Sequence, residues 1–170
     1  MAPARDFRRY GFAADRINRC AHYIGGESYW KLYAIENTLR VVINSVLTAQ
    51  FGPNWWSVAV DPRITRDAQR FRGQYTSRPR HASPGRHDIY LVFLSQLNQI
   101  IRIHSNLFRP VISDVDRWIA RLEGIRLPRN LVGHMNFPNY YDRGRINNSY
   151  QRLPTLLTRL RDKGIQILIP

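Results

Sequence analysis

Arg129, Asn130 and His134 are the residues whose types and spacing best suit a chemical reaction. Histidine titrates near neutral pH, which suits proton transfer, and arginine stays charged and binds phosphate. RNA cleavage without a metal needs three groups. A base must deprotonate the 2′-hydroxyl, a cation must stabilise the negative charge that develops on the phosphate, and an acid must protonate the leaving 5′-oxygen. On a helix, positions 129 and 134 are roughly 140° apart around the axis and about 7.5 Å apart along it. They can therefore flank one phosphate without hydrogen-bonding each other, and Asn130, on the same face as His134, can orient the imidazole.

The spacing of these residues is a weak signal by itself, because the chain is rich in arginine. Of 26 lysines and arginines only Lys31 and Lys163 are lysines, which leaves 24 arginines beside five histidines. An arginine five residues before a histidine then arises by chance about 0.7 times, and an asparagine directly after that arginine lowers this to about 0.05. Arg129 as a surface charge and His134 as a core histidine are the structural alternatives.

The net charge of +14 points to a nucleic-acid partner. Arginine holds phosphate with a planar pair of hydrogen bonds and stacks on bases, and 12% of the residues are aromatic. A codon bias that replaces lysine by arginine would explain the ratio of the two residues, but it would not explain the excess of positive charge.

The remaining composition predicts a cytoplasmic protein with no disulfide, metal or cofactor. Cys20 is a lone cysteine, and no cysteine and histidine cluster has zinc spacing. The first 23 residues lack the apolar centre of a signal peptide, and no apolar run of eighteen residues exists, so we expect no contact with a membrane.

Apolar residues recur at helical spacing, which predicts a single all-α domain over residues 1–170, a bundle of five to six helices. Gly25-Gly26 is expected to end the first helix and Gly52-Pro53 the second, while Pro128 suits the first position of the helix that carries Arg129. Residues 139–152 are expected to form a polar loop, and residues 165–169 an extended tail. The expected helices of the bundle span residues 6–23, 27–51, 88–107, 110–124, 128–136 and 154–163, and a further short helix is possible over 65–75.

Residues 57–87 are expected to form a basic, mostly irregular insertion that follows a phosphate backbone. Proline and glycine interrupt the helical spacing of apolar residues in this stretch, and only a short helix over 65–75 is expected in it. The alternative is a merely solvated insertion. The candidate RNA-binding arginines in this stretch are Arg63, Arg66, Arg70, Arg72, Arg78, Arg80 and Arg86.

Arg129-Asn130-x-x-x-His134 resembles the signature of the HEPN superfamily, small helical domains that often act as ribonucleases in toxin–antitoxin and phage-defence systems. The segment Glu36-Asn-Thr-Leu-Arg40 and the Phe51-Gly-Pro-Asn-Trp-Trp56 run after it resemble the abortive-infection branch of that superfamily. The resemblance covers residues 29–136, with these segments in the expected order.

The resemblance implies that Arg129 and His134 are the catalytic pair and that Asn130 gives polar support. It also implies a homodimer in which two signatures face each other across one groove, with RNA as substrate and an antitoxin or regulatory protein as a further partner. Residues on the earlier helix are candidates for support of the site or for the dimer face: Tyr33, Glu36, Asn37 and Arg40.

These observations favour a metal-independent endoribonuclease that leaves a 2′,3′-cyclic phosphate and a 5′-hydroxyl. A non-catalytic HEPN module that binds RNA, a nucleotide or a protein is the second hypothesis, although such a module would have no chemical need for the Arg/Asn/His set. A helical DNA-binding domain is the third, and the absence of a helix-turn-helix pattern speaks against it.

Overall fold

The computed structural model describes residues 6–78 and 80–170, so the first five residues of the expected domain lie outside it. The described chain is all-helical, without strands, as the sequence predicts. It has more helical segments than the five or six expected, because several expected helices are split and two, over residues 55–59 and 140–150, were not expected. In chain order they are η1 (Phe7–Arg9), α1 (Ala14–Ile24), η2 (Gly25–Tyr29), α2 (Trp30–Phe51), α3 (Trp55–Ala59), α4 (Pro62–Thr76), η3 (Asp88–Leu91), α5 (Leu94–Ile103), α6 (Ser105–Phe108), α7 (Val115–Gly124), α8 (Arg126–Gly133), α9 (Tyr140–Tyr150) and α10 (Leu153–Asp162).

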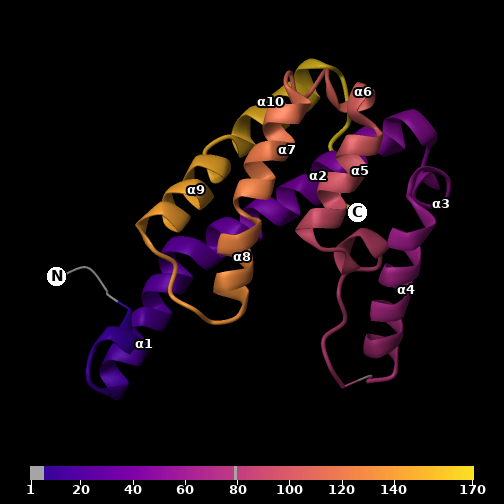
Figure 1. Cartoon of the computed structure of the whole chain (residues 1–170). Helices are drawn as coiled ribbons and strands as arrows, with labels where there is room; N and C mark the ends of the chain where they lie inside the picture. The colour runs from indigo at the N-terminus through magenta and orange to yellow at the C-terminus, as the bar shows by residue number, and fades with distance from the viewer. Residues whose placement is uncertain (1–5, 79) are drawn as a thin grey trace.

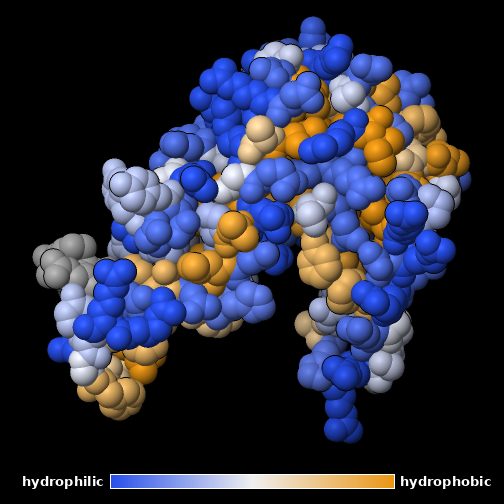
Figure 2. Space-filling view, viewed as in Figure 1, coloured by the Kyte–Doolittle hydropathy of each residue, from blue (hydrophilic) through white to orange (hydrophobic). Residues whose placement is uncertain are grey.

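Helix α2 is the central element of the bundle, and α3, α5, α9 and α10 all pack against it (Figure 1). Its predicted apolar stripe is buried along its whole length, from Leu32 through Ile35, Leu39 and Val42 to Val46. Helix α7 packs against α5, α8 and α9, and this places α8 beside α2. Helix α4 extends away from the bundle, and Figure 2 shows the molecule hollowed between α4 and the part that carries α1 and α8.

The glycine pair at positions 25 and 26 does not end the first helix, contrary to the prediction. Residues 25–29 form one π-helical turn, and α1, η2 and α2 run on without interruption. Gly25 keeps ordinary right-handed angles, and the Trp30 indole N–H donates to the Gly26 carbonyl at 2.6 Å. Glycine permits a chain reversal but does not impose one, and a π turn absorbs an extra residue inside a helix.

The helix expected over residues 88–107 is split into η3, α5 and α6, and Arg40 explains the first break. The Arg40 guanidinium donates to the carbonyls of Ile89 and Val92, both at 3.2 Å. The Phe93 amide is bound by the Gln96 side chain at 2.9 Å, so α5 begins afresh at Leu94. Tyr90 is therefore only half-buried and Phe93 is exposed, whereas the apolar spacing of one continuous helix over residues 88–107 predicts both in the core.

The polar segment after the signature is helix α9, where the sequence analysis expected a loop. Only Ile146 and Ser149 of this helix are buried, so the apolar period is missing. The signal that marks its start is a capping box, in which the side chains of Asn139 and Asp142 bind each other's backbone amides at 2.9 and 3.1 Å.

The basic stretch over residues 57–87 is more ordered than expected, because α4 spans Pro62–Thr76. Asp61 caps α4 by accepting the Arg63 amide at 2.7 Å, and Pro62 occupies its first turn. Among the described residues of this stretch, the irregular segment that follows α4 covers residues 77–78 and 80–87. The C-terminal tail is extended as expected, and Leu168 bonds to Asn44 and Ser45 of α2 at 2.9 Å each.

Candidate active site

Helix α8 carries Arg129 and Asn130 and begins at Arg126, two residues earlier than expected. Pro128 is the third residue of the helix and is buried, so it still lies in the first turn, where a missing amide costs no hydrogen bond. The Arg129 amide donates to the Ile125 carbonyl at 2.8 Å. The proline therefore does not shift Arg129 out of the helix.

The helix ends at Gly133 rather than at residue 136, and His134 is its C-cap. The Met135 and Asn136 amides bind the carbonyls of Val132 and Leu131 at 3.0 and 2.9 Å, which is a Schellman motif. Met135 has a φ of 58°, a conformation that usually calls for glycine. The chain after His134 is therefore turned sharply at a strained residue.

Arg129 forms an ion pair with Glu36 of α2, although 93 positions separate them. The Arg129 Nε lies 2.9 Å from the Glu36 Oε1, and the Arg40 Nη2 lies 3.1 Å from the Oε2 of the same carboxylate. The Glu36 side chain is 13% exposed, so solvent screens the pairs only weakly. One carboxylate between two guanidinium groups leaves a net positive charge at this point.

Glu36 binds only the Nε of Arg129, so the direction of the guanidinium group determines where its two terminal nitrogens lie. Its Nη1 lies 3.9 Å from the position that a Cβ would take on Gly133, the residue before His134. The guanidinium group therefore extends along α8 toward the end that carries the histidine. No other side-chain hydrogen bond of Arg129 occurs among the described residues, which leaves its two terminal nitrogens available for a ligand.

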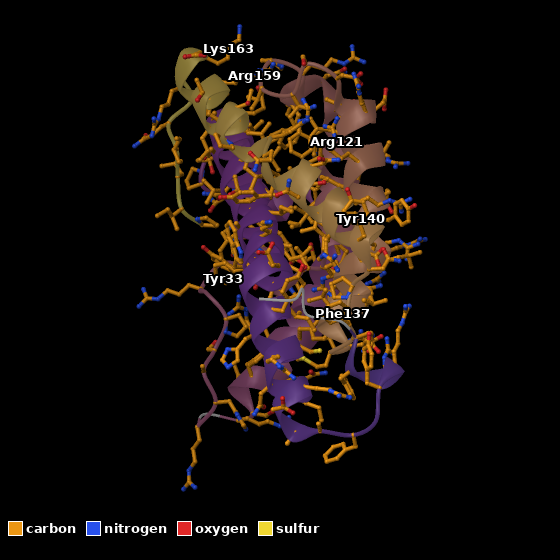
Figure 3. All side chains as sticks on the ribbon, turned by 90° about the vertical axis from the view of Figure 1, so that its left-hand side faces the viewer. Tyr33, Arg121, Phe137, Tyr140, Arg159 and Lys163 are labelled. Carbon is orange, nitrogen blue, oxygen red and sulfur yellow. The ribbon has the colours of Figure 1, made fainter. Side chains whose placement is uncertain are left out.

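The candidate support residues on α2 surround the same ion pairs. The Asn37 side chain accepts from Arg40 at 3.3 Å and donates to the Tyr33 carbonyl at 2.9 Å. The Tyr33 ring is 65% exposed, on the side of α2 that Figure 3 displays. The sequence analysis named these residues, and the structure brings them together with Arg129.

A cleft of about 610 Å³ lies over this group of residues, and its volume is typical of a ligand site. One wall consists of the end of η2 together with α2 and α8, including Tyr29, Tyr33, Glu36 and Arg129. Pro84, Gly85 and Tyr90, from the segment before and within η3, form the opposite wall, and the sequence analysis did not identify them. A Cβ on Gly85 would lie 2.4 Å from the Tyr90 ring, so only glycine fits where this wall packs.

His134 and Asn130 lie outside the cleft of their own chain. Both are exposed, and neither side chain makes a hydrogen bond within residues 6–78 and 80–170, although the His134 carbonyl accepts from the Asn136 side chain at 2.9 Å. Asn130 contacts His134 through its backbone carbonyl, which accepts the His134 amide at 2.9 Å, and not through the expected side-chain bond to the imidazole. The reason is that His134 has already left the helix at the C-cap.

An aromatic and basic cluster adjoins the end of α8, and the sequence analysis missed it. The rings of Tyr23 and Phe137 stack with 5.7 Å between their centroids, and Arg143 lies over both at 5.4 and 5.9 Å. Tyr140 and Tyr141 beside it are three-quarters exposed. These residues match no sequence motif, and Tyr140, Tyr141 and Arg143 belong to α9, which the sequence did not predict.

The candidate RNA-binding arginines fall into two groups. Arg72 is ion-paired with Asp88 at 2.7 Å and also donates to the Arg86 carbonyl at 2.9 Å, so it joins α4 to η3. Arg70 lies 3.9 Å from Asp67, and its guanidinium carbon is 5.6 Å from the centroid of the Phe71 ring. The exposed members of the set are Arg63, Arg66, Arg70, Arg78, Arg80 and Arg86.

Within the described residues, no three His, Cys, Asp or Glu side chains are grouped as a metal site would require. No helix of that same part of the chain has the length and apolar character needed to cross a membrane. Comparisons with protein-family models, with curated proteins and with solved structures found no match for this chain.

Proposed function

We propose that the protein is a metal-independent endoribonuclease of the HEPN type. The observation that carries the proposal is the Arg129–Glu36 ion pair at the edge of the cleft, which fixes a guanidinium group while leaving its terminal nitrogens free. A phosphate that enters the cleft would meet this group, and stabilisation of charge that develops on phosphate is a large part of such catalysis.

The chemical step is attack of the ribose 2′-oxygen on the adjacent phosphorus. A bond from the 2′-oxygen to phosphorus forms, the bond from phosphorus to the 5′-oxygen breaks, and one proton moves from the 2′-hydroxyl to a base. A second proton passes from an acid to the leaving 5′-oxygen, so the products are a 2′,3′-cyclic phosphate and a 5′-hydroxyl. His134 is the group proposed for both transfers because imidazole titrates near neutral pH.

The position of His134 supports a site shared between two copies. In one chain His134 is exposed at the end of α8 and is not among the residues that line the cleft. Two copies related by a two-fold axis can place two histidines about one phosphate, one as base and one as acid. Exposed apolar side chains near this end of the molecule, Leu127 and Met135 among them, suit such a contact.

The first experiment is incubation of the purified protein with total RNA in EDTA. We expect cleavage by the wild type and a loss of at least about 100-fold in His134→Ala and Arg129→Ala, the size typical of general acid–base and charge-stabilising residues. Labelling of the fragments at their 5′ ends without prior phosphatase treatment would identify 5′-hydroxyl products. RNA binding without cleavage by the wild type would instead favour the non-catalytic binding module.

The shared site has its own test, which is the oligomeric state in light scattering. We expect a dimer at concentrations where RNA is cut. A monomer that cuts at the full rate would contradict the shared site while leaving the ribonuclease proposal intact.

A toxin or anti-phage role is the biological context that we propose for this activity. Expression of the wild type without its partner should then arrest growth, and expression of His134→Ala should not. Growth that is unaffected by an active wild-type enzyme would remove the need for an antitoxin or regulatory partner.

A further inference from the structure

A second, smaller concavity lies between α7 and α10, and it shares no lining residue with the cleft. Its volume is about 140 Å³. Figure 3 shows Arg121 and Arg159 near the upper end of the molecule, well above Tyr33 of the cleft. We call this concavity the arginine pocket, because four of its lining residues are arginines: Arg117, Arg121, Arg152 and Arg159.

The positive charge of the arginine pocket is not neutralised. Asp114 is the acidic residue of its lining, and its carboxylate caps α7 by accepting the Arg117 amide at 2.9 Å. Among the residues that the structure describes, no carboxylate lies within ion-pair distance of any of the four guanidinium groups. Four positive charges against one negative charge leave a net charge of +3 in the pocket.

Two of the arginines are already held in place. The Arg159 Nη1 donates to the Val111 carbonyl and to the Ser113 hydroxyl, both at 3.3 Å. The Arg121 guanidinium carbon lies 5.8 Å from the centroid of the Trp118 ring. Side chains that are ordered before a ligand arrives lose less entropy when they bind it.

The start of α10 adds to the positive potential of the pocket. Its N-cap is Arg152, whose side chain has no acceptor to offer the free amides of the first turn. The positive end of the helix dipole therefore faces the pocket without a capping group. The Thr155 hydroxyl lines the same place and has no hydrogen-bond partner among the described residues.

The positive charges of the arginines in the pocket repel one another. Burial lowers the pKa of Arg121 below its ordinary range, and the charges of Arg152 and Arg117 lower it further, against a smaller opposite effect of Asp114. Like charges in a partly buried place repel, and a bound anion would relieve that repulsion.

We propose that the arginine pocket binds one phosphate group. Guanidinium groups suit a phosphate because their paired N–H donors match its oxygens. The pocket is too small for a whole nucleotide, since sites for drug-sized ligands occupy about 300–1,000 Å³. The phosphate belongs either to an RNA backbone that continues beyond the cleft or to a small phosphorylated molecule. The proposal does not depend on the ribonuclease activity.

The first test is thermal unfolding in inorganic phosphate and in chloride at equal ionic strength. The pocket variant is Arg117→Gln/Arg152→Gln, since both side chains are exposed and make no contact that holds the fold. The control is Arg109→Gln/Arg161→Gln, which removes the same charge outside the pocket. At saturating phosphate we expect the Tm of the wild type and the control to rise by about 3–5 °C. The pocket variant should not respond. An equal rise in the pocket variant would overturn the proposal.

The second test separates the two sources of phosphate. The affinity for a 2′-O-methylated, uncleavable RNA oligonucleotide is measured by fluorescence anisotropy for the same three proteins. If the source is the RNA backbone, the pocket variant should bind about tenfold more weakly than the control. Equal RNA affinity together with a phosphate-dependent Tm identifies a small phosphorylated molecule. Equal RNA affinity without any phosphate-dependent Tm refutes the site.

Discussion

At the scale of single residues, the structure assigns different positions to the members of the Arg129/Asn130/His134 signature. Arg129 pairs with Glu36 and lines the cleft, while His134 is the C-cap of α8 and is exposed to solvent. A pair of groups arranged in this way suits a phosphate that lies between two molecules better than one bound within a single chain.

Replacement of Glu36 by glutamine tests its role as a positioning residue. Glutamine keeps an acceptor for Arg129 but removes the charge that holds both guanidinium groups, so we expect kcat to fall about tenfold to 100-fold with little change in KM. The purely structural alternative predicts a lower Tm with kcat unchanged in the folded fraction. Tyr33→Phe, in the same wall of the cleft, is the control for a general disturbance of that wall.

Replacement of Met135 by glycine should stabilise the protein. A left-handed residue other than glycine costs about 1–2 kcal/mol, and the extra freedom of glycine in the unfolded chain offsets roughly half of this. We expect the free energy of unfolding in urea to rise by about 0.5–1 kcal/mol. Met135→Ala keeps the strained conformation and loses only an exposed side chain, so it should change little. Equal stability of the two variants would show that the turn is not strained.

At the scale of elements, the walls of the cleft depend on side chains that join α2 and α4 to η3. Arg40 binds the carbonyls of Ile89 and Val92, and Arg72 binds Asp88. His87 stacks on Trp55 with 5.0 Å between the ring centroids and meets Trp56 edge-on. These contacts fix the segment that supplies the far wall.

His87 should make the stability of this segment depend on pH. Burial lowers the pKa of His87 from its ordinary value of 6.5, with Asp88 acting in the opposite direction and Arg72 adding to the effect. The unfolded chain therefore binds a proton at a higher pH than the folded chain does. The contribution of neutral His87 is complete above about pH 6.5 and is lost as the pH falls toward its lower folded value.

The variant His87→Asn keeps an acceptor for the Ile89 amide, which the His87 Nδ1 now accepts at 3.1 Å, but does not titrate. We expect the Tm of the wild type to fall more between pH 7 and pH 5 than the Tm of this variant. Circular dichroism at the two pH values measures the difference. A fall of equal size in both proteins would contradict the assignment of the pH dependence to His87.

At the scale of the whole molecule, the net charge of +14 is spread over several surfaces. Helix α4 and the residues after it carry one group of exposed arginines, and the arginine pocket carries another. The cleft lies between α8 and the segment that follows α4 (Figure 2). An RNA strand in the cleft would therefore have positive charge near it on the α4 side.

Substitution of Arg63, Arg66 and Arg70 by glutamine should weaken RNA binding without changing the rate of cleavage at saturating RNA. If all three contact phosphates, the slope of log affinity against log salt should become smaller by about 2, the value for single strands. Arg72 is left in place because its loss would break the pair with Asp88. Arg102, Arg109 and Arg161 replaced together give a control with the same charge. A fall in the saturating rate would place the α4 arginines in the chemical step.

The sequence by itself determined the helical class and most of the core, because burial of an apolar face leaves a period of 3.6 residues that can be read directly. The apolar stripes of α2, α7 and α10 are buried, including Leu153, Leu156 and Leu160, while Leu157, also expected to point inward, is half-buried. The same reasoning failed for α9, whose exposed face shows no such period, and at Gly25-Gly26, where glycine allows a break that the packing does not use.

Only the tertiary structure decided which residues meet Arg129. Glu36 and Arg129 are separated by 93 positions, and no local pattern encodes a contact of that length. The break at Phe93 and the far wall of the cleft depend on Arg40 reaching carbonyls about fifty residues away. The arginine pocket likewise arises where α7 and α10 pack together. A side chain's type limits what it can bind, but packing decides which partner lies within reach.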